Sequence, residues 1–449
     1  MSWTSTGRYW RRPLDCHDRL FQAFSAIGAP LGREHWLLFG WIELKFATNV
    51  TTADQERRLR SAWSALRLRH PDVALTLHDD EKRYEPLQSD ADLSKWTSET
   101  FYVEKEARCV DELIPRLKLS PSKHASCHWF PTSKEILIVS PHWRWDGKGI
   151  VMLLSALVEL SSLDSTRLAS LPQPGAEAVN LVPSLNSLLD ITSETVIEKK
   201  WCEKADQMLA SFVDGTPALG MASKDASLPQ DTKRIVTKLS NETMATVLEA
   251  CRSRGIRFTA ALHASIAKIV YDEQSATLGS RYKSWAAFDL RKYCPTPANS
   301  SGHAPSLRMM ALPMVAEPKL PWDELASIMQ SVYDEPMEVG SDAMSVRVPY
   351  VERATKVLAH MPVTTEPNLS NLGKLDDLVK KNYGDIGVRG LSLAVQMLSP
   401  QLYVHSWGWD GETQISVCYN EAFYDGNSVR GWLERVKISL LENLGVNTN

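Results

Sequence analysis

Two patterns of apolar and polar residues alternate along the first third of the chain. Residues 36–46 are aromatic and aliphatic around a glycine, which predicts a strand. In residues 52–69 apolar side chains recur at helical spacing and arginines cover the other face, which predicts a helix. Residues 126–130 and 135–140 flank a polar turn and predict a β-hairpin, whose second strand is apolar enough to be buried on both faces. Residues 147–160 then predict a helix.

The second half of the chain repeats this alternation. Residues 234–239 alternate between apolar and polar side chains and predict a strand. Ser240 predicts the N-cap of a following helix, and Thr259 predicts the N-cap of the next one. Residues 402–406 and 413–419 predict two strands, and the Asp-Gly pair between them favours a tight hairpin turn.

The stretch after the first third of the sequence shows neither the helical spacing nor the strand pattern of apolar residues. Periodicity fails between residues 161 and 183, where the Pro- and Gly-containing stretch 171–175 is the strongest linker candidate. A chain of 449 residues is too long for one ordinary core. We therefore expect a mixed α/β protein with an N-terminal lobe at 1–183 and a C-terminal lobe at 184–449.

Composition and charge exclude several classes of protein. The formal net charge is −4, and the arginines of residues 52–69 are interpreted as the solvated face of a helix, so no nucleic-acid partner is expected. The longest apolar stretch is too short to span a bilayer, and no signal peptide opens the chain. None of the seven cysteines forms a C-x-x-C pair, so neither a metal site nor a redox site is expected. These features predict a soluble, cytoplasmic protein with free thiols and no membrane partner, taken here as a monomer.

One short segment carries candidate chemistry. Residues 141–147 read P-H-W-R-W-D-G, and His142 is the only one of eleven histidines with an aspartate four positions later. The segment follows the apolar strand and precedes a predicted helix, so a side chain here has a rigid support and can face a cleft. A neutral imidazole can take the proton of a hydroxyl as that hydroxyl attacks a thioester carbonyl, and can return it to the leaving thiolate. Such chemistry requires no metal or redox cofactor.

The spacing alone also allows a structural interpretation. About one His-x-x-x-acid pair is expected by chance in a chain of this composition. His142 would then be a packed histidine at the edge of the core, and Asp146 an acidic loop residue. Even in the catalytic interpretation, Asp146 need not contact the imidazole. It can instead pair with an arginine and fix the loop that orients His142.

Several segments resemble one known group of proteins. Residues 141–147 resemble the H-H-x-x-x-D-G signature of non-ribosomal peptide condensation domains. They also resemble the H-x-x-x-D motif of plant-type and fungal acyltransferases and of chloramphenicol acetyltransferase. Further segments resemble this group in the same order along the chain: 59–75, 239–270, 288–293, 369–373 and 417–425. The nearest likeness is to stand-alone fungal O-acetyltransferases of the trichothecene-acetylating type.

The resemblance implies a fold and an activity. The fold would be two chloramphenicol-acetyltransferase-like lobes that form a V with a central tunnel. The activity would be O-acyl transfer, taken to be acetyl transfer, from a CoA thioester to a hydroxyl group of a hydrophobic secondary metabolite. Acetyl-CoA or another acyl-CoA would be a co-substrate, and no cofactor is implied.

The resemblance also assigns roles to individual residues. His142 becomes the general base and Asp146 its structural partner, paired with Arg291. Gly147 is the candidate backbone donor to the forming oxyanion. Trp143 and Trp145 flank the histidine and are candidates either for substrate binding along the tunnel or only for packing at the lobe interface. Ser370 and Asn371 are weaker candidates for substrate binding, through oxyanion or crossover contacts.

Departures from the family pattern leave other functions open. The first histidine of the condensation signature is Pro141 here, which favours a stand-alone transferase over a peptide synthetase module. The same fold can serve amide formation, acyl transfer from a carrier protein, or a cyclisation without an acyl donor. A non-catalytic binding protein on this scaffold is a further alternative, which the intact His-x-x-x-Asp-Gly sequence disfavours.

Overall fold

The described chain divides into two compact units that interleave in sequence. The computed structural model describes residues 2–117, 124–168, 170–191, 196–214, 218–273, 281–300, 303, 305–358 and 364–447. Unit 1 comprises Met1–Val196, Asp289–Met309 and Asp376–Gln396, and unit 2 comprises Ile197–Phe288, Met310–Leu375 and Met397–Asn449. Two segments from the second half of the sequence thus return to unit 1. The boundary predicted after residue 183 falls within the first segment of unit 1, and as a division into lobes it stays a prediction.

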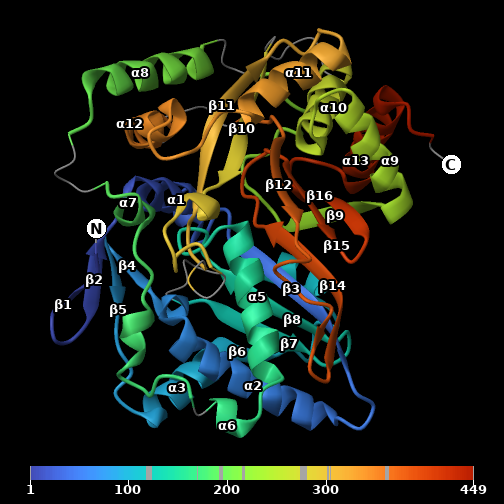
Figure 1. The fold of residues 1–449 in the computed structure, drawn as a ribbon. Coiled ribbons are helices and arrows are strands. Elements are labelled where there is room, and N and C mark those ends of the chain that lie inside the picture. Colours follow the sequence, from blue (N-terminus) through green and yellow to red (C-terminus); the bar gives the residue numbers. More distant parts are fainter. Residues whose placement is uncertain are drawn as a thin grey trace. The chain divides into compact units, whose positions relative to one another are not determined.

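The larger sheet of unit 1 combines strands from both halves of the sequence (Figure 1). Its strands in spatial order are β13 (Asn382–Tyr383), β14 (Ile386–Val395), β3 (Leu38–Phe46), β8 (Glu135–Ser140), β7 (Ser126–Phe130) and β6 (Phe101–Val103). Neighbouring strands are antiparallel except for the parallel pair β6 and β7. The longest ladder joins β14 to β3, with Ile386 opposite Phe46 and Val395 opposite Leu38. A segment from the second half of the sequence therefore pairs with β3, the strand that lies beside the motif strand β8 in the sheet.

A second, antiparallel sheet of unit 1 is smaller. Its strands in spatial order are β1 (Thr4–Ser5), β2 (Trp10–Pro13), β5 (Glu81–Tyr84) and β4 (Thr76–His78). The α-helices of this unit are α1 (Cys16–Ala26), α2 (Thr52–Arg69), α3 (Asp90–Thr100), α4 (Val110–Leu113), α5 (Gly147–Ser161), α6 (Ser165–Leu168) and α7 (Leu185–Leu188). Short 3₁₀ turns lie at Ala29–Leu31, Pro71–Ala74, Ile114–Arg116, Glu177–Asn180 and Arg291–Tyr293.

Helix α5 packs closely on the larger sheet. It lies against β3 and beside α2, and Figure 1 shows it crossing one face of this sheet. Its apolar residues are buried almost all round, as expected for a helix between a sheet and another helix. The close approach depends on Gly40 in β3, because a Cβ there would lie 3.1 Å from Ile150 Cγ1. The start of α5, where the motif ends, is thereby fixed relative to the sheet.

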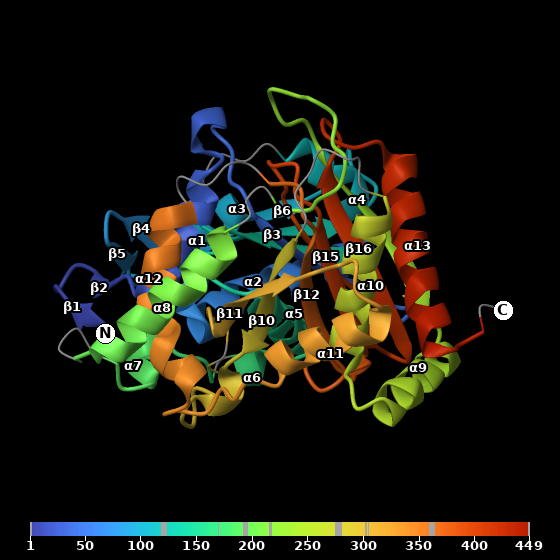
Figure 2. The same cartoon turned by 90° about the horizontal axis from the view of Figure 1, so that it is seen from above.

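Unit 2 is a sheet with helices packed against it. Its strands in spatial order are β12 (Asn368–Lys374), β15 (Tyr403–Trp409), β16 (Glu412–Asn420) and β9 (Thr232–Leu239), with β12 and β15 parallel and the other pairs antiparallel. The helices are α8 (Lys199–Val213), α9 (Asn241–Ser253), α10 (Phe258–Asp272), α11 (Trp322–Tyr333), α12 (Asp342–Leu358) and α13 (Gly426–Leu444). The paired strands β10 (Tyr282–Asp289) and β11 (Met309–Ala316) belong mainly to this unit. Both views show α8 beside α12 (Figure 2).

Most of the predicted elements are confirmed. The strand at 36–46, the helix at 52–69, the hairpin at 126–140 and the helix from residue 147 all form. Asp410 and Gly411 both have positive φ, 49° and 81°, as a tight hairpin turn requires. Ser240 caps α9 by accepting a hydrogen bond from the Thr243 N–H. The predicted cap at Thr259 is wrong, because α10 begins at Phe258 and Arg257, two residues before Thr259, occupies the N-cap position.

We predict that Gly40→Val lowers the free energy of unfolding by about 2 kcal/mol, since the new methyl groups would press on Ile150 in a packed core. The measurement is urea denaturation followed by tryptophan fluorescence. The matched control is Gly387→Val in the neighbouring strand β14. There, the nearest heavy atom to an added Cβ is 3.5 Å away, so a loss below about 1 kcal/mol is expected. Equal losses would contradict close packing at Gly40.

Candidate active site

The candidate base lies in a turn between a strand and a helix. Strand β8 ends at Ser140, and the Arg144 N–H donates to the Pro141 carbonyl at 3.2 Å, which closes a turn around His142. Helix α5 begins three residues later, at Gly147. The apolar β8 strand anchors one side of the turn and the packed helix anchors the other. Local sequence therefore suffices to place His142 at a rigid junction.

Aromatic rings enclose the His142 imidazole. Phe21 of α1 stacks on it, with ring centroids 4.3 Å apart and planes at 22°. Trp36 lies with its centroid 6.0 Å away, and its φ of 56° is unusual for a bulky residue. His142 is only 7% exposed, and its Nδ1 is enclosed without a hydrogen-bond partner among the described residues.

Burial controls the charge of this imidazole. It lowers the pKa of His142 to about 4, although the nearby backbone of His142 and Trp145 and the Asp146 carboxylate act in the opposite direction. The cause is the loss of water around the charged form. At neutral pH the ring is uncharged, which is the form that can accept a proton.

The Asp146 carboxylate is fully engaged away from the imidazole. Its two oxygens accept from the Arg291 guanidinium at 2.8 and 3.0 Å. It also caps α5 by accepting from the Gly149 N–H at 2.8 Å, and it accepts from the Arg308 N–H at 2.9 Å. The side chains of Asp146 and Arg291 are each 5% exposed. Asp146 therefore joins the start of the helix to residues 289–309, and the structure brings it together with Arg291.

Arg291 is itself held at several points. It lies in the 3₁₀ turn after β10 and also contacts the Asp289 carboxylate at 3.1 Å and the Ser306 carbonyl at 3.1 Å. Burial tends to lower the pKa of Arg291, but the carboxylates of Asp146 and Asp289 outweigh burial and raise it. The guanidinium is thus a fixed cation.

The two motif tryptophans are packed side chains. The centroid of the Trp143 ring lies 4.3 Å from the Arg144 guanidinium carbon and 5.4 Å from Lys82 Nζ. Trp145 is fully buried. Arg144 donates to Ser140 Oγ at 3.0 Å and to the carbonyl of residue 75 at 2.6 Å, and burial lowers its pKa to about 9. Contact of either tryptophan with substrate stays a prediction.

The remaining predicted residues occupy distinct places. Gly147 is the first residue of α5, where helix N–H groups lack partners within the helix, so its oxyanion role stays a prediction. Ser370 and Asn371 lie on β12 in unit 2. The Asn371 side chain donates to Thr259 Oγ1 at 2.7 Å and accepts from the Gly373 N–H at 3.0 Å. The amide oxygen thus spans the local β-bulge, and the amide nitrogen joins β12 to α10.

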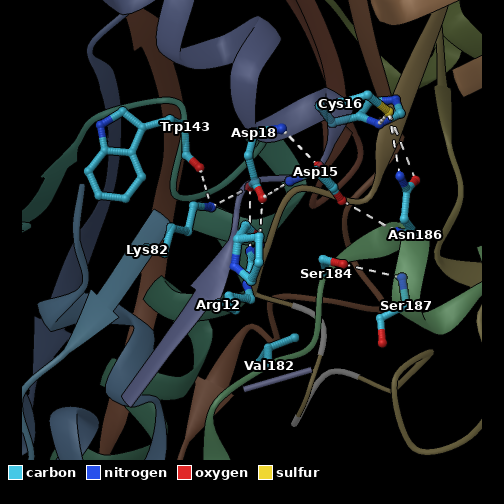
Figure 3. A network of polar contacts seen from close by, with 12 residues as sticks. Arg12, Asp15, Cys16, Asp18, Lys82, Trp143, Val182, Ser184, Asn186 and Ser187 are labelled. Atoms are coloured by element: carbon cyan, nitrogen blue, oxygen red, sulfur yellow. Dashed lines mark hydrogen bonds and ion pairs between the residues drawn. The ribbon is translucent and has the colours of Figure 1, made fainter. Parts of the chain in front are cut away.

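Sequence reasoning missed a buried ion cluster beside the motif (Figure 3). Asp18 contacts Arg12 at 2.5 Å and Lys82 at 2.6 Å, and each of the three side chains is at most 3% exposed. Burial would raise the pKa of Asp18, but the two cations outweigh burial and hold that pKa well below its ordinary value. Lys82 also donates to the Trp143 carbonyl at 2.8 Å. Arg12 and Lys82 lie in short strands and Asp18 lies at the start of α1, and no sequence spacing connects the three charges.

Metal and membrane sites were also sought. Within the described ranges, no group of three His, Cys, Asp or Glu side chains is arranged to hold a metal ion. None of the helices in the described part of the chain combines the length and apolar character needed to cross a bilayer.

Comparison with known proteins identifies relatives over nearly the whole chain. No family model matches the sequence. The chain is 28% identical to the acetyltransferase pigO of Monascus ruber, with 99% of each protein covered. It is 27% identical to the O-acetyltransferase pigM of the same organism, with 99% of this chain and 88% of pigM covered.

Solved structures show the same fold. The trichothecene 15-O-acetyltransferase TRI3 of Fusarium sporotrichioides has a TM-score of 0.81 at 17% identity, with 98% of this chain and 97% of that chain covered. The first condensation domain of the calcium-dependent antibiotic synthetase has a TM-score of 0.68 at 11% identity, with 97% and 96% covered. The chain thus has the mixed α/β fold of condensation domains. It shares this fold with TRI3, and its sequence is similar to the acetyltransferases pigO and pigM, which confirms the predicted resemblance.

We predict that Arg291→Met lowers the free energy of unfolding by about 3–5 kcal/mol, because it leaves the Asp146 carboxylate buried without its cation. The double variant Asp146→Asn, Arg291→Met should recover part of this loss, since the amide oxygen can still cap α5. Urea denaturation of both variants gives the comparison. Lys148→Met is the control, because its ion pair with Asp289 is about 30% exposed, and we expect a loss below about 1 kcal/mol. A double variant that is less stable than Arg291→Met would contradict the proposed dependence of the Asp146 carboxylate on the Arg291 cation.

We also predict that the His142 imidazole titrates with a midpoint near pH 4 in the folded protein. The measurement is NMR of protein labelled with ¹³Cε1-histidine, with the His142 signal assigned by its absence in His142→Gln. In urea, the same ring should titrate near its ordinary pKa of about 6.5. Because the unfolded chain binds the extra proton first, stability from this residue should fall as the pH drops from 6.5 towards 4. A folded midpoint above 6 would contradict the enclosure of the ring.

Proposed function

We propose that this protein is an O-acyltransferase that moves an acyl group, taken to be acetyl, from a CoA thioester to a hydroxyl group of a hydrophobic secondary metabolite. The observation that carries the proposal is the neutral, enclosed imidazole of His142 in a turn held by the Asp146–Arg291 ion pair. A base of this kind can work at neutral pH, and its support keeps it in one orientation.

The proposed reaction has two proton transfers and one acyl transfer. The imidazole removes the hydroxyl proton of the acceptor while the hydroxyl oxygen attacks the thioester carbonyl carbon. The tetrahedral intermediate then collapses, the carbon–sulfur bond breaks, and the imidazolium returns the proton to the thiolate. An ester and a free thiol result, and the base is regenerated.

The surrounding residues have separate roles in this scheme. Asp146 does not relay a proton, because Arg291 and two backbone N–H groups already occupy its oxygens. It fixes the turn and the start of α5. The N–H of Gly147, at the positive end of the helix dipole, is assigned to the oxyanion of the intermediate.

The choice of acyl group and of a hydroxyl acceptor is supported by the names of the relatives. One curated relative carries the name O-acetyltransferase, and TRI3 is named for acetylating a hydroxyl group of a trichothecene. A hydrophobic acceptor is consistent with the aromatic rings of Phe21 and Trp36 beside the imidazole. We therefore place the acceptor among hydroxylated terpenoids and polyketides.

We predict that His142→Ala lowers kcat for acetyl transfer about 10³-fold, because general base catalysis contributes roughly 10²–10⁴-fold. The assay mixes protein, acetyl-CoA and a panel of hydroxylated terpenoids and polyketides, and it measures free CoA together with the mass of the ester. His78→Ala, on the exposed strand β4, is the control and should keep its rate. Undiminished turnover in His142→Ala would remove His142 from the base role, and transfer only to amines would favour amide formation.

A further inference from the structure

We propose that Lys82 is a positioning residue for His142, acting through the carbonyl of Trp143. The inference rests on the proposed function, because it assigns to a buried ammonium the task of holding the turn that carries the base. Lys82 lies on β5, in the smaller sheet of unit 1, and is 1% exposed. Its Nζ donates to the Trp143 carbonyl at 2.8 Å and contacts Asp18 Oδ1 at 2.6 Å (Figure 3).

The bonded carbonyl belongs to the same turn as the base. The turn runs from Pro141 to Arg144 and has His142 and Trp143 as its central residues. A hydrogen bond to this carbonyl restrains the peptide plane that follows Trp143. The Arg144 side chain and Asp146 restrain the next positions, so Lys82 supplies the side-chain hydrogen bond to the residue directly after His142.

The stability of the fold does not by itself explain a buried lysine at position 82. Removing an ammonium from water is costly, and a well-packed apolar side chain of similar volume is often as stable as a buried ion pair. Asp18 compensates for the charge, yet Arg12 already provides that carboxylate with a cation. What Lys82 adds, and Arg12 does not, is the bond to the motif turn.

The same cluster also fixes the ring that stacks on the base. Asp18 and Asp15 form a reciprocal capping box at the start of α1. Phe21, one helical turn later, stacks on the His142 imidazole. The backbone that carries the imidazole and the aromatic ring against its face are therefore both tied to Asp18. A shift of the reacting nitrogen by about 1 Å can reduce a rate about 10²-fold, so this common anchor matters for catalysis.

The test compares Lys82→Met with Arg12→Met. Each variant removes one of the two cations on Asp18, but only Lys82→Met removes the donor to Trp143. We expect Lys82→Met to lower kcat about 10–100-fold, with the KM of both substrates within about threefold, and Arg12→Met to keep kcat within about threefold. Rates are compared at equal folded fraction, measured by near-UV circular dichroism.

A second readout needs no turnover. In ¹³Cε1-histidine NMR at pH 7, the His142 signal should move in Lys82→Met and stay in place in Arg12→Met. If the wild-type protein transfers no acyl group, the proposed function fails while this NMR comparison still decides the positioning role. Should Lys82→Met not fold, Lys82→Gln is used with Arg12→Gln as its control, because the uncharged Gln side chain is one atom shorter than Lys and its amide ends short of the Trp143 carbonyl. Equal effects of the two variants on the His142 signal and on kcat would overturn the inference.

Discussion

The carboxylate of Asp146 is the interaction on which the site depends. It caps α5, binds the guanidinium of Arg291 and accepts the Arg308 N–H, so it joins a helix start to a segment about 150 residues later in the sequence. A buried carboxylate with this many donors cannot move without losing a charged hydrogen bond. The motif turn is consequently held at its C-terminal side by an interaction that is strong and directional.

The charged side chains near the motif are paired with one another, and the His142 imidazole among them is uncharged. Aspartates and basic side chains are paired in two buried clusters, one around Asp146 and one around Asp18, and both contact the motif segment. The imidazole of His142 lies beside the rings of Phe21 and Trp36 and stays uncharged at neutral pH. The ion pairs thus fix the position of the motif segment, while burial lowers the pKa of His142.

The fold by itself does not fix the chemistry. Condensation domains and TRI3 share this architecture at 11–17% identity with the present chain, and shared folds often carry different reactions. The features on which the proposed acyltransferase function rests are local: a proline before the histidine, a neutral imidazole and an aspartate paired with Arg291. Function is therefore proposed from the site and not from the fold alone.

The sequence by itself determined the local elements and the motif. The apolar run of β8, the helical spacing of α2 and the His-x-x-x-Asp-Gly segment are short-range patterns, and the Arg291 partner came from resemblance. Only the tertiary structure decided that β14 pairs with β3. It also decided that Asp18 binds both Arg12 and Lys82, and that Lys82 donates to the Trp143 carbonyl. These contacts join residues far apart in the chain, so their energies depend on packing and burial, which no local pattern of side chains encodes.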